Sequence, residues 1–232
     1  MDKDKDKDKN KKLTEQMIKI VNDKKNTNVI EDLLCLEKDN PSNIAILQMI
    51  SQQYLLREKN TEALHYINKA YEIDPDNYGV NYNLGRLYQK FKKTDKAIIF
   101  YKNSISLNSK FKEGFNSLGN LYFQKENYQL SIDCFKKSFD LDKTKENITT
   151  IAKLAEGLRN ISLQNNNNED LKESKFYYEL INKMMPNNNM IISNIINISR
   201  ILGLKNEATL FEKKTFGVFV FDVDKNKIAL KY

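Results

Sequence analysis

The chain has 232 residues, a length that suits one sizeable domain or two small ones. Only 3 residues are proline and 7 are glycine, so the composition favours long, uninterrupted helices. Lysine and arginine total 38 against 31 aspartate and glutamate, with the two signs interleaved, so the net charge of +7 does not indicate a nucleic-acid-binding stripe. No apolar run has the length of a signal peptide or a membrane span, and neither is expected.

Residues 1–12 alternate aspartate and lysine and then run into asparagine and lysine, with no apolar residue between Met1 and Leu13. Such a segment cannot bury a core, so we predict a disordered, charged lead. Each lysine has an aspartate or another polar residue beside it, which argues against a polybasic membrane tether.

Residues 10–43 carry apolar side chains at helical spacing, among them Leu13, Ile20 and Leu33, and Pro41 falls where a turn would close the segment. Pro41 and Pro75 are 34 residues apart, so the segment is interpreted as a degenerate first unit of a repeat array.

A 34-residue period runs through residues 44–77, 78–111 and 112–145. Each period predicts two helices with 3.6-residue periodicity, and a mid-helix glycine, which costs about 1 kcal/mol relative to alanine, indicates close approach of the two helices. Small residues are expected to face that glycine from the second helix, and the recurring tyrosines to fill the space beside it. The recurring positions are Tyr54, Tyr88 and Tyr122; Ser51, Gly85 and Gly119; and Ala63, Ala97 and Ser131.

The stretches Asn83–Tyr88 and Ser117–Tyr122, together with Thr61 to Pro75, give this period a specific form that resembles the tetratricopeptide repeat. The resemblance implies an all-α fold, an α-solenoid of about six helix-turn-helix repeats over residues 13–214 that forms a right-handed superhelix. Terminal units of such arrays are expected to be atypical caps.

Two further units follow, at 146–188 and 189–216. The first contains the asparagine-rich insertion 164–169, which is predicted to be a polar loop between two helices. In the second, Ala208 takes the small-residue position, 22 residues after Pro186.

Residues 215–232 differ in composition from the helical units before them. Gly217 to Val223 is rich in β-branched and aromatic residues, and Ile228 to Tyr232 could form a returning strand, so a short β-hairpin-like tail is predicted. Three interpretations stay open: the tail packs on the end of the solenoid, it pairs with a strand of a partner, or it is partly disordered.

Catalytic, cofactor-binding and metal sites are not expected, and the chain is not predicted to be an enzyme. His65 is the sole histidine, and Asp222 and Asp224 lack the glycine and glutamate that a calcium loop needs after them. Cys35 and Cys134 lie in apolar helical patterns, which predicts two buried free thiols in a reducing compartment.

In the resembling family, the first helices of successive repeats line a concave groove in which ligands lie. Amide side chains can donate to and accept from a peptide backbone, and an arginine there can pair with a carboxylate or phosphate. The candidate groove residues are Gln48, Met49, Gln52, Tyr82, Asn83, Arg86, Lys90, Asn116, Asn120 and Gln124. The family's chaperone clamp for a C-terminal carboxylate is not expected, because only Asn83 fits its pattern and Glu113 would repel the ligand.

The resemblance therefore implies a protein-interaction adaptor or scaffold that binds a peptide or protein partner in this groove. The alternative is a structural subunit of a larger multiprotein complex, and an RNA-associated helper is the third hypothesis. The expected location is the cytoplasm, with the nucleus left open.

Overall fold

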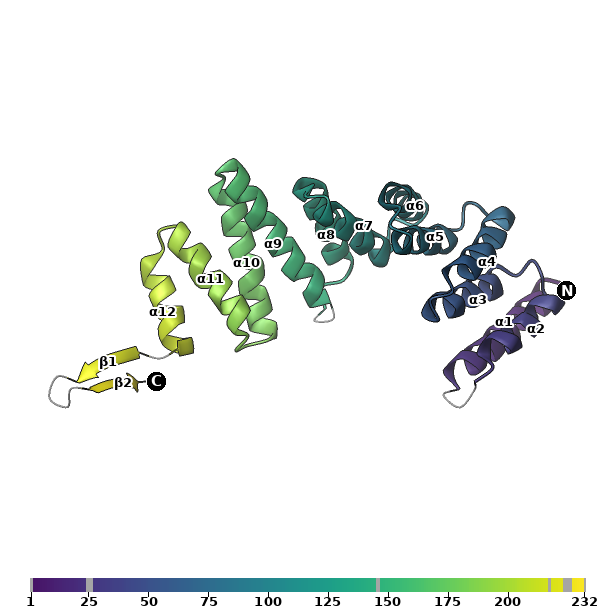
Figure 1. Cartoon of the computed structure of the whole chain (residues 1–232), viewed down its shortest axis with the longest axis horizontal. Helices are drawn as coiled ribbons and strands as arrows, with labels where there is room; N and C mark the ends of the chain where they lie inside the picture. The colour runs from purple at the N-terminus through teal and green to yellow at the C-terminus, as the bar shows by residue number, and fades with distance from the viewer. Residues whose placement is uncertain (1, 24–26, 145–146, 217, 223–226, 232) are drawn as a thin grey trace. The chain divides into compact units, whose positions relative to one another are not determined.

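The computed structural model describes the backbone of residues 2–23, 27–144, 147–216, 218–222 and 227–231, and the side chains of residues 11–213 within those ranges. These residues form helices joined by short links, followed by two strands (Figure 1). The elements are α1 (Asp2–Asn22), α2 (Val29–Asp39), α3 (Ile44–Leu56), α4 (Asn60–Ile73), α5 (Tyr78–Lys90), α6 (Thr94–Leu107), α7 (Lys112–Gln124), α8 (Tyr128–Leu141), α9 (Ile148–Asn165), α10 (Asn168–Met184), α11 (Asn189–Ile201), α12 (Lys205–Phe216), β1 (Val218–Asp222) and β2 (Lys227–Lys231).

The chain divides into two compact units, Met1–Gly114 and Phe115–Tyr232. In the first unit α3 packs against α4 and α5 against α6; in the second, α9 packs against α10 and α11 against α12. The second helix of one pair also packs against the first helix of the next, as α4 does on α5 and α10 on α11. This arrangement of stacked helix pairs is an α-solenoid.

Asparagine side chains begin several of the first helices. The side chain of Asn43 accepts a hydrogen bond from the backbone N–H of Ile46, and Asn77, one 34-residue period later, accepts from Gly79 and Val80. Capping of this kind satisfies N–H groups that lack a partner in the first turn. The abundant asparagine of this sequence thus helps to define where helices start.

A close approach of two helices explains the recurring glycine. A Cβ atom placed on Gly85 would lie 2.6 Å from the ring of Tyr101, and one on Gly119 would lie 2.8 Å from the ring of Phe135. Both rings are almost fully buried. The sequence predicted that small residues would face these glycines. Ser131 does contact Gly119 through its hydroxyl, and in addition a buried aromatic ring of the second helix occupies the space beside each glycine.

The predicted small positions let a serine hydroxyl of one helix reach a backbone carbonyl of the paired helix. Ser51 Oγ on α3 donates to the carbonyl of Ala63 on α4 at 2.8 Å, and Ser131 Oγ on α8 donates to the carbonyl of Gly119 on α7 at 2.9 Å. The same pair of positions is joined in both repeats, with donor and acceptor exchanged between the helices. A bulky side chain at either position would break the contact.

The predicted tyrosine positions pack against the second helices. Tyr54 stacks on Tyr66 with ring centroids 5.7 Å apart, and Tyr88 stacks on Phe100 at 5.3 Å. Stacked pairs of this kind add to the stabilisation that area burial provides. The aromatic residues thus hold α3 to α4 and α5 to α6.

The asparagine-rich insertion is not a loop over residues 164–169, as the sequence predicted. Instead, α9 and α10 contain 18 and 17 residues, against 13 in α5 and 14 in α6, so most of the extra length is helical. Asn166 ends α9 in the left-handed conformation, and the side chain of Asn167 accepts from the backbone N–H of Glu169 to begin α10. Adding a residue to an existing helix is cheap, and asparagine suits both caps.

The N-terminal segment also differs from the predicted disordered lead, because α1 begins at Asp2. The segment after Leu13 is anchored by Met17, which is 3% exposed. Once that part is helical, each residue added toward the N-terminus gains a backbone hydrogen bond for the ordering of one residue. Lysine, which alternates with aspartate there, is a good helix former.

At the other end, β1 and β2 pair antiparallel, with Val218 opposite Lys231 and Asp222 opposite Lys227. The side chains of this segment lie outside the described residues. The function of the tail therefore stays a prediction.

Replacing Gly85 by alanine should lower the free energy of unfolding by about 1–2 kcal/mol, because overpacking against the Tyr101 ring outweighs the gain in helix propensity. Urea denaturation followed by circular dichroism measures this change. Gly79→Ala is the control, since its new Cβ would meet only the side-chain amides of Gln48, at 3.0 Å, and Asn77, at 3.3 Å. Equal stability of Gly85→Ala and wild type would contradict the packing argument.

Tyr177 supplies a pH-dependent prediction. Burial raises its pKa to about 12, and the charges of Glu173 and Asp140 act in the same direction. The unfolded chain loses the phenol proton near pH 10 while the folded chain keeps it until about pH 12, so stability falls over this interval by up to about 1.4 kcal/mol per pH unit. Denaturation at pH 9, 10 and 11 should therefore show a steeper loss for wild type than for Tyr177→Phe, and parallel curves would refute the assignment.

Candidate peptide-binding surface

The candidate residues of the first unit lie on α3 and α5, and those of the second unit on α7. On α3, Gln48 is half-buried and Gln52 is exposed, whereas Met49 packs against the core formed by α1, α2 and α3. Met49 is thus engaged in packing with the preceding helices, which its polar counterparts Asn83 and Ser117 in the next two repeats did not suggest.

A pocket of about 420 Å³ brings two of the candidates together on the first unit. Its lining residues are Leu55 from α3, Arg86, Gln89 and Lys90 from α5, and Lys92 from the turn that follows. The sequence singled out Arg86 and Lys90 but missed the other three. Gln89 could have been found from its position three residues after Arg86, since residues three apart share a helix face. Leu55 and Lys92 lie on other elements, so no helical spacing connects them to the two candidates.

Aromatic packing orients the polar groups of this pocket. The guanidinium carbon of Arg86 lies 6.0 Å from the ring centroid of Tyr82, and that ring packs against Phe111 with centroids 4.9 Å apart. The hydroxyl of Tyr101 donates to Gln89 Oε1 at 2.9 Å. Because Tyr101 is the ring that covers Gly85, the helix contact in the core also fixes a side chain of the pocket.

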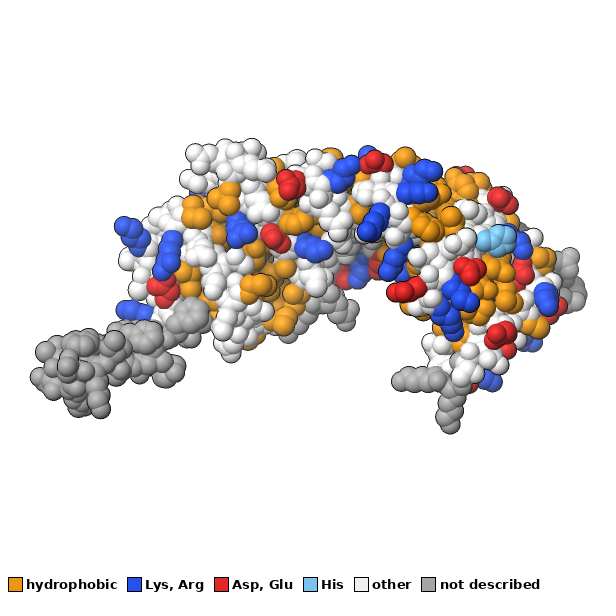
Figure 2. Space-filling view, viewed as in Figure 1, with side chains coloured by type: hydrophobic (Ala, Val, Ile, Leu, Met, Phe, Trp, Pro, Cys, Tyr) orange, Lys and Arg blue, Asp and Glu red, His pale blue; other side chains and the backbone are white. Residues whose placement is uncertain are grey.

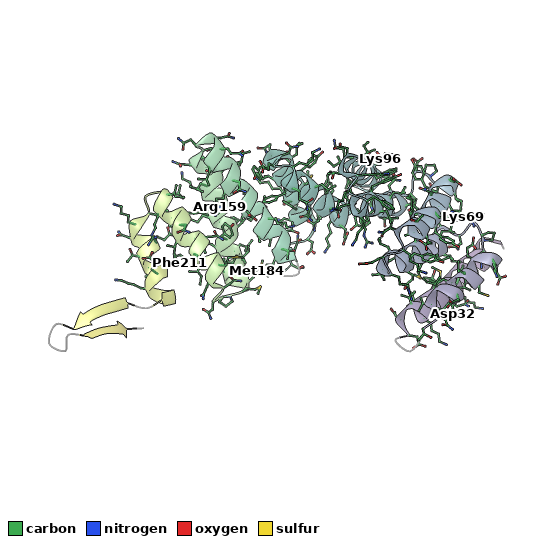
Figure 3. The ribbon with its side chains drawn as sticks, viewed as in Figure 1. Asp32, Lys69, Lys96, Arg159, Met184 and Phe211 are labelled. Carbon is green, nitrogen blue, oxygen red and sulfur yellow. The ribbon has the colours of Figure 1, made fainter. Side chains whose placement is uncertain are left out.

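The cations of the pocket lack the carboxylate partners that several other cations of the chain have. Lys69, labelled in Figure 3, pairs with Glu37, and Lys175 lies 3.0 Å from Glu179 and 2.6 Å from Glu207. Among the side chains that the structure describes, Arg86, Lys90 and Lys92 have no carboxylate within ion-pair distance. The lining of the pocket therefore carries three positive charges and no negative one.

On the second unit, the amides of α7 contact α9. Asn116 Oδ1 accepts from Thr150 Oγ1 at 2.9 Å, and Asn120 Oδ1 accepts from the ammonium of Lys153. A lysine can only donate, so the oxygen of Asn120 must face it. The amide nitrogens of both asparagines are then the groups available to a ligand. Gln124 is exposed at the end of α7.

A further polar contact joins α9 to α11 in the second unit. Arg159, labelled in Figure 3, donates from Nη1 to Asn194 Oδ1 at 3.4 Å. Successive first helices of this unit are thus linked by side-chain hydrogen bonds, which sets the face that they share apart from the apolar core behind it.

The residues considered for other chemistry are dispersed. Within the described ranges, no three histidine, cysteine, aspartate or glutamate side chains gather as a metal site would require. His65 is exposed beside Tyr66. Cys134 is buried as predicted, but Cys35 is exposed, because its position on α2 falls between the two positions, Leu33 and Leu36, that face the core. No helix of the described part combines the length and apolarity needed to cross a bilayer. Asp222 lies in β1, while Asp224 lies outside the described residues.

Comparison with known proteins adds to these observations. Tetratricopeptide-repeat sequence families match residues 54–104 and 113–145. The crystal structure of YrrB, described as a tetratricopeptide-repeat protein with an unusual peptide-binding site, superposes with a TM-score of 0.67 at 14% identity over 80% of this chain and 91% of that one. The chain is a tetratricopeptide-repeat protein.

Other solved structures show the same fold. The MamA protein superposes with a TM-score of 0.62 at 20% identity, covering 74% of this chain and 88% of MamA. A tetratricopeptide repeat protein from Parabacteroides merdae superposes with a TM-score of 0.60 at 20% identity, covering 89% of this chain and 78% of that protein. At these identities the likeness establishes the fold and not a shared partner.

Two curated relatives are similar to part of this chain. One is a UDP-N-acetylglucosamine–peptide N-acetylglucosaminyltransferase of Giardia intestinalis, 30% identical over 89 residues. The other is anaphase-promoting complex subunit CDC16 of Saccharomyces cerevisiae, 28% identical over 122 residues. The matches cover 38% and 50% of this chain but only 6% and 14% of the two relatives. In general, tetratricopeptide repeats serve protein interaction and are not themselves catalytic.

Proposed function

We propose that this protein is an adaptor or scaffold, and that the face formed by α3 and α5 of its first unit binds an extended segment of a protein partner. The observation that carries the proposal is the pocket in which Arg86 and Lys90 lie together with Leu55, Gln89 and Lys92. Its volume is within the range of ligand sites in proteins, about 300–1,000 Å³.

The chemistry of the surrounding face suits an extended peptide. Gln48 and Asn83 are half-buried amides and Gln52 is an exposed one, so α3 and α5 carry hydrogen-bond donors and acceptors in addition to the pocket residues. An extended chain exposes backbone N–H and C=O groups that need such partners. The peptide-binding site named for YrrB, a protein of the same fold, supports a peptide as the ligand class.

A second candidate function is that of a structural subunit in a larger complex. It is favoured by the similarity to CDC16, a subunit of the anaphase-promoting complex, and by apolar side chains on the surface of the second unit. Phe176 and Leu204, which are 58% and 42% exposed, line a pocket of about 210 Å³ with Leu202. Groups of exposed apolar residues often mark protein contacts.

A cytoplasmic or nuclear location forms part of the proposal. Cys35 and Cys134 are both free thiols, and Cys35 is exposed, which fits a reducing compartment.

The proposal is tested by selecting peptides from a random twelve-residue display library against the wild-type chain. The affinity of the selected peptides is then measured by fluorescence anisotropy. The Asn83→Ala/Arg86→Ala variant should bind at least about tenfold more weakly, since it loses an amide and a charged hydrogen-bond donor. Asn103→Ala/Lys110→Ala is the matched control, because both side chains are exposed and neither residue belongs to α3 or α5.

Equal binding by both double variants would show that the α3–α5 face is not the binding surface. If the wild type selects no peptide and instead co-purifies in a stable complex, the structural-subunit candidate is favoured. Circular dichroism of each variant establishes that it is folded before its affinity is compared.

A further inference from the structure

We propose that the pocket formed by Leu55, Arg86, Gln89, Lys90 and Lys92 is an acid-recognition subsite, selecting partner segments that present two glutamate or aspartate side chains. This inference rests on the proposed function and specifies the chemistry of the partner. We refer to these five residues as the cationic pocket.

The positive charges of the cationic pocket are peculiar to one repeat. The residues one 34-residue period before and after Arg86 are Gln52 and Asn120, and those around Lys90 are Leu56 and Gln124. All of these counterparts are neutral. Both repeats form the same helix pair without the charges, so folding does not require a cation at either position.

The positive charge of Lys92 is also absent from the neighbouring repeats, where its counterparts Glu58 and Glu126 are acidic. All three residues adopt the left-handed conformation, with φ of 59°, 57° and 59° for Glu58, Lys92 and Glu126. The turn is therefore a structural feature of the repeats, whereas the charge that it carries varies. In the third repeat this turn places a lysine on the lining of the pocket.

The three cations are not neutralised within the described part of the chain. Two unit charges of the same sign at about 4 Å repel by about 1 kcal/mol even in water, and more beside protein. The elongated side chains can spread apart to reduce this repulsion. A bound anion would go further, because its attraction to the three cations would outweigh their mutual repulsion. Two carboxylates best match three cations, because they leave little net charge and the volume of about 420 Å³ exceeds what one acidic side chain fills.

The neutral members of the lining also fit an acidic side chain. Gln89 Oε1 is occupied by the hydroxyl of Tyr101, so the amide presents its NH₂ group as a donor. The polar side chains of the lining can then all donate a hydrogen bond, and a carboxylate is an acceptor with no proton to give. Leu55 supplies an apolar wall for the methylene groups of glutamate. Side chains i and i+2 of an extended segment lie on one face, so an acidic pair with this spacing can enter together.

The distribution of charge on the visible face favours a peptide over a nucleic acid as the ligand. Figure 2 shows lysine and arginine interspersed with aspartate and glutamate over the displayed face, rather than a continuous basic stripe. A nucleic-acid backbone needs positive charge along an extended track. A single cationic pocket flanked by amide side chains instead suits one acidic site in a peptide.

The test compares the peptides that the random library yields on two folded forms of the full chain. The wild type should yield peptides enriched in acidic residues, with pairs at i and i+2. The variant Arg86→Gln/Lys90→Gln should lose this enrichment. Lys110→Gln/Lys137→Gln removes the same charge from two exposed lysines elsewhere and should retain it, which controls for the net charge of +7.

A double-mutant cycle then locates the contact. A selected peptide and its Glu→Gln form are titrated into wild type and into Arg86→Gln/Lys90→Gln. Neutralising the peptide should weaken binding to the wild type at least about tenfold, and should change binding to the variant by less than about threefold. A non-additive result of this size shows that the acidic groups meet the cationic pocket.

Four results would overturn the inference. Selected peptides without acidic enrichment, or equal losses in the variant and its control, would leave peptide binding intact but remove acid recognition. A twenty-nucleotide single-stranded DNA that displaces the peptide at equal or lower concentration would assign the pocket to nucleic acid. Failure of the wild type to select any peptide would refute the proposed function as well.

Discussion

The contact between a helical glycine and an aromatic ring of the following helix is the constraint on which the repeats depend. At Gly85 the ring of Tyr101 occupies the space that a Cβ atom would need, and Phe135 does the same at Gly119. The contact sets how closely two helices approach. Because Tyr101 also bonds to Gln89 and packs beside Tyr82, it connects the core of the third repeat to the wall of its pocket.

Positions that do not take part in the contact between glycine and ring can differ in residue type from one repeat to the next. The positions of Arg86, Lys90 and Lys92 are occupied in neighbouring repeats by neutral or acidic residues, and the same helix pairs form in all three cases. A repeat fold can therefore acquire a local binding chemistry without loss of its packing, since each helix pair contacts mainly its neighbours. Function on such a scaffold is carried by the few positions that depart from the period.

Particular residues show where sequence reasoning fell short. The asparagine-rich segment 164–169 was predicted to be a loop from its composition, yet Asn166 and Asn167 serve as the two caps of a tight link between lengthened helices. Met49 was assigned to the surface by its position in the period, but the first two helices offer it an apolar neighbour. Cys35 was predicted to be buried and lies outside the narrow stripe of α2 that the core covers. In each case the outcome depended on what packs against the residue.

By itself the sequence determined the repeating helix pairs, because a 34-residue period in small, apolar and aromatic residues can be recognised without knowledge of tertiary contacts. It also located Arg86 and Lys90 on a first helix. Only the tertiary structure decided that an aromatic ring fills the space beside Gly85 and Gly119. It alone brought Leu55 and Lys92 beside the two cations, because such contacts join different elements, and their distances depend on how side chains fill the space between helices.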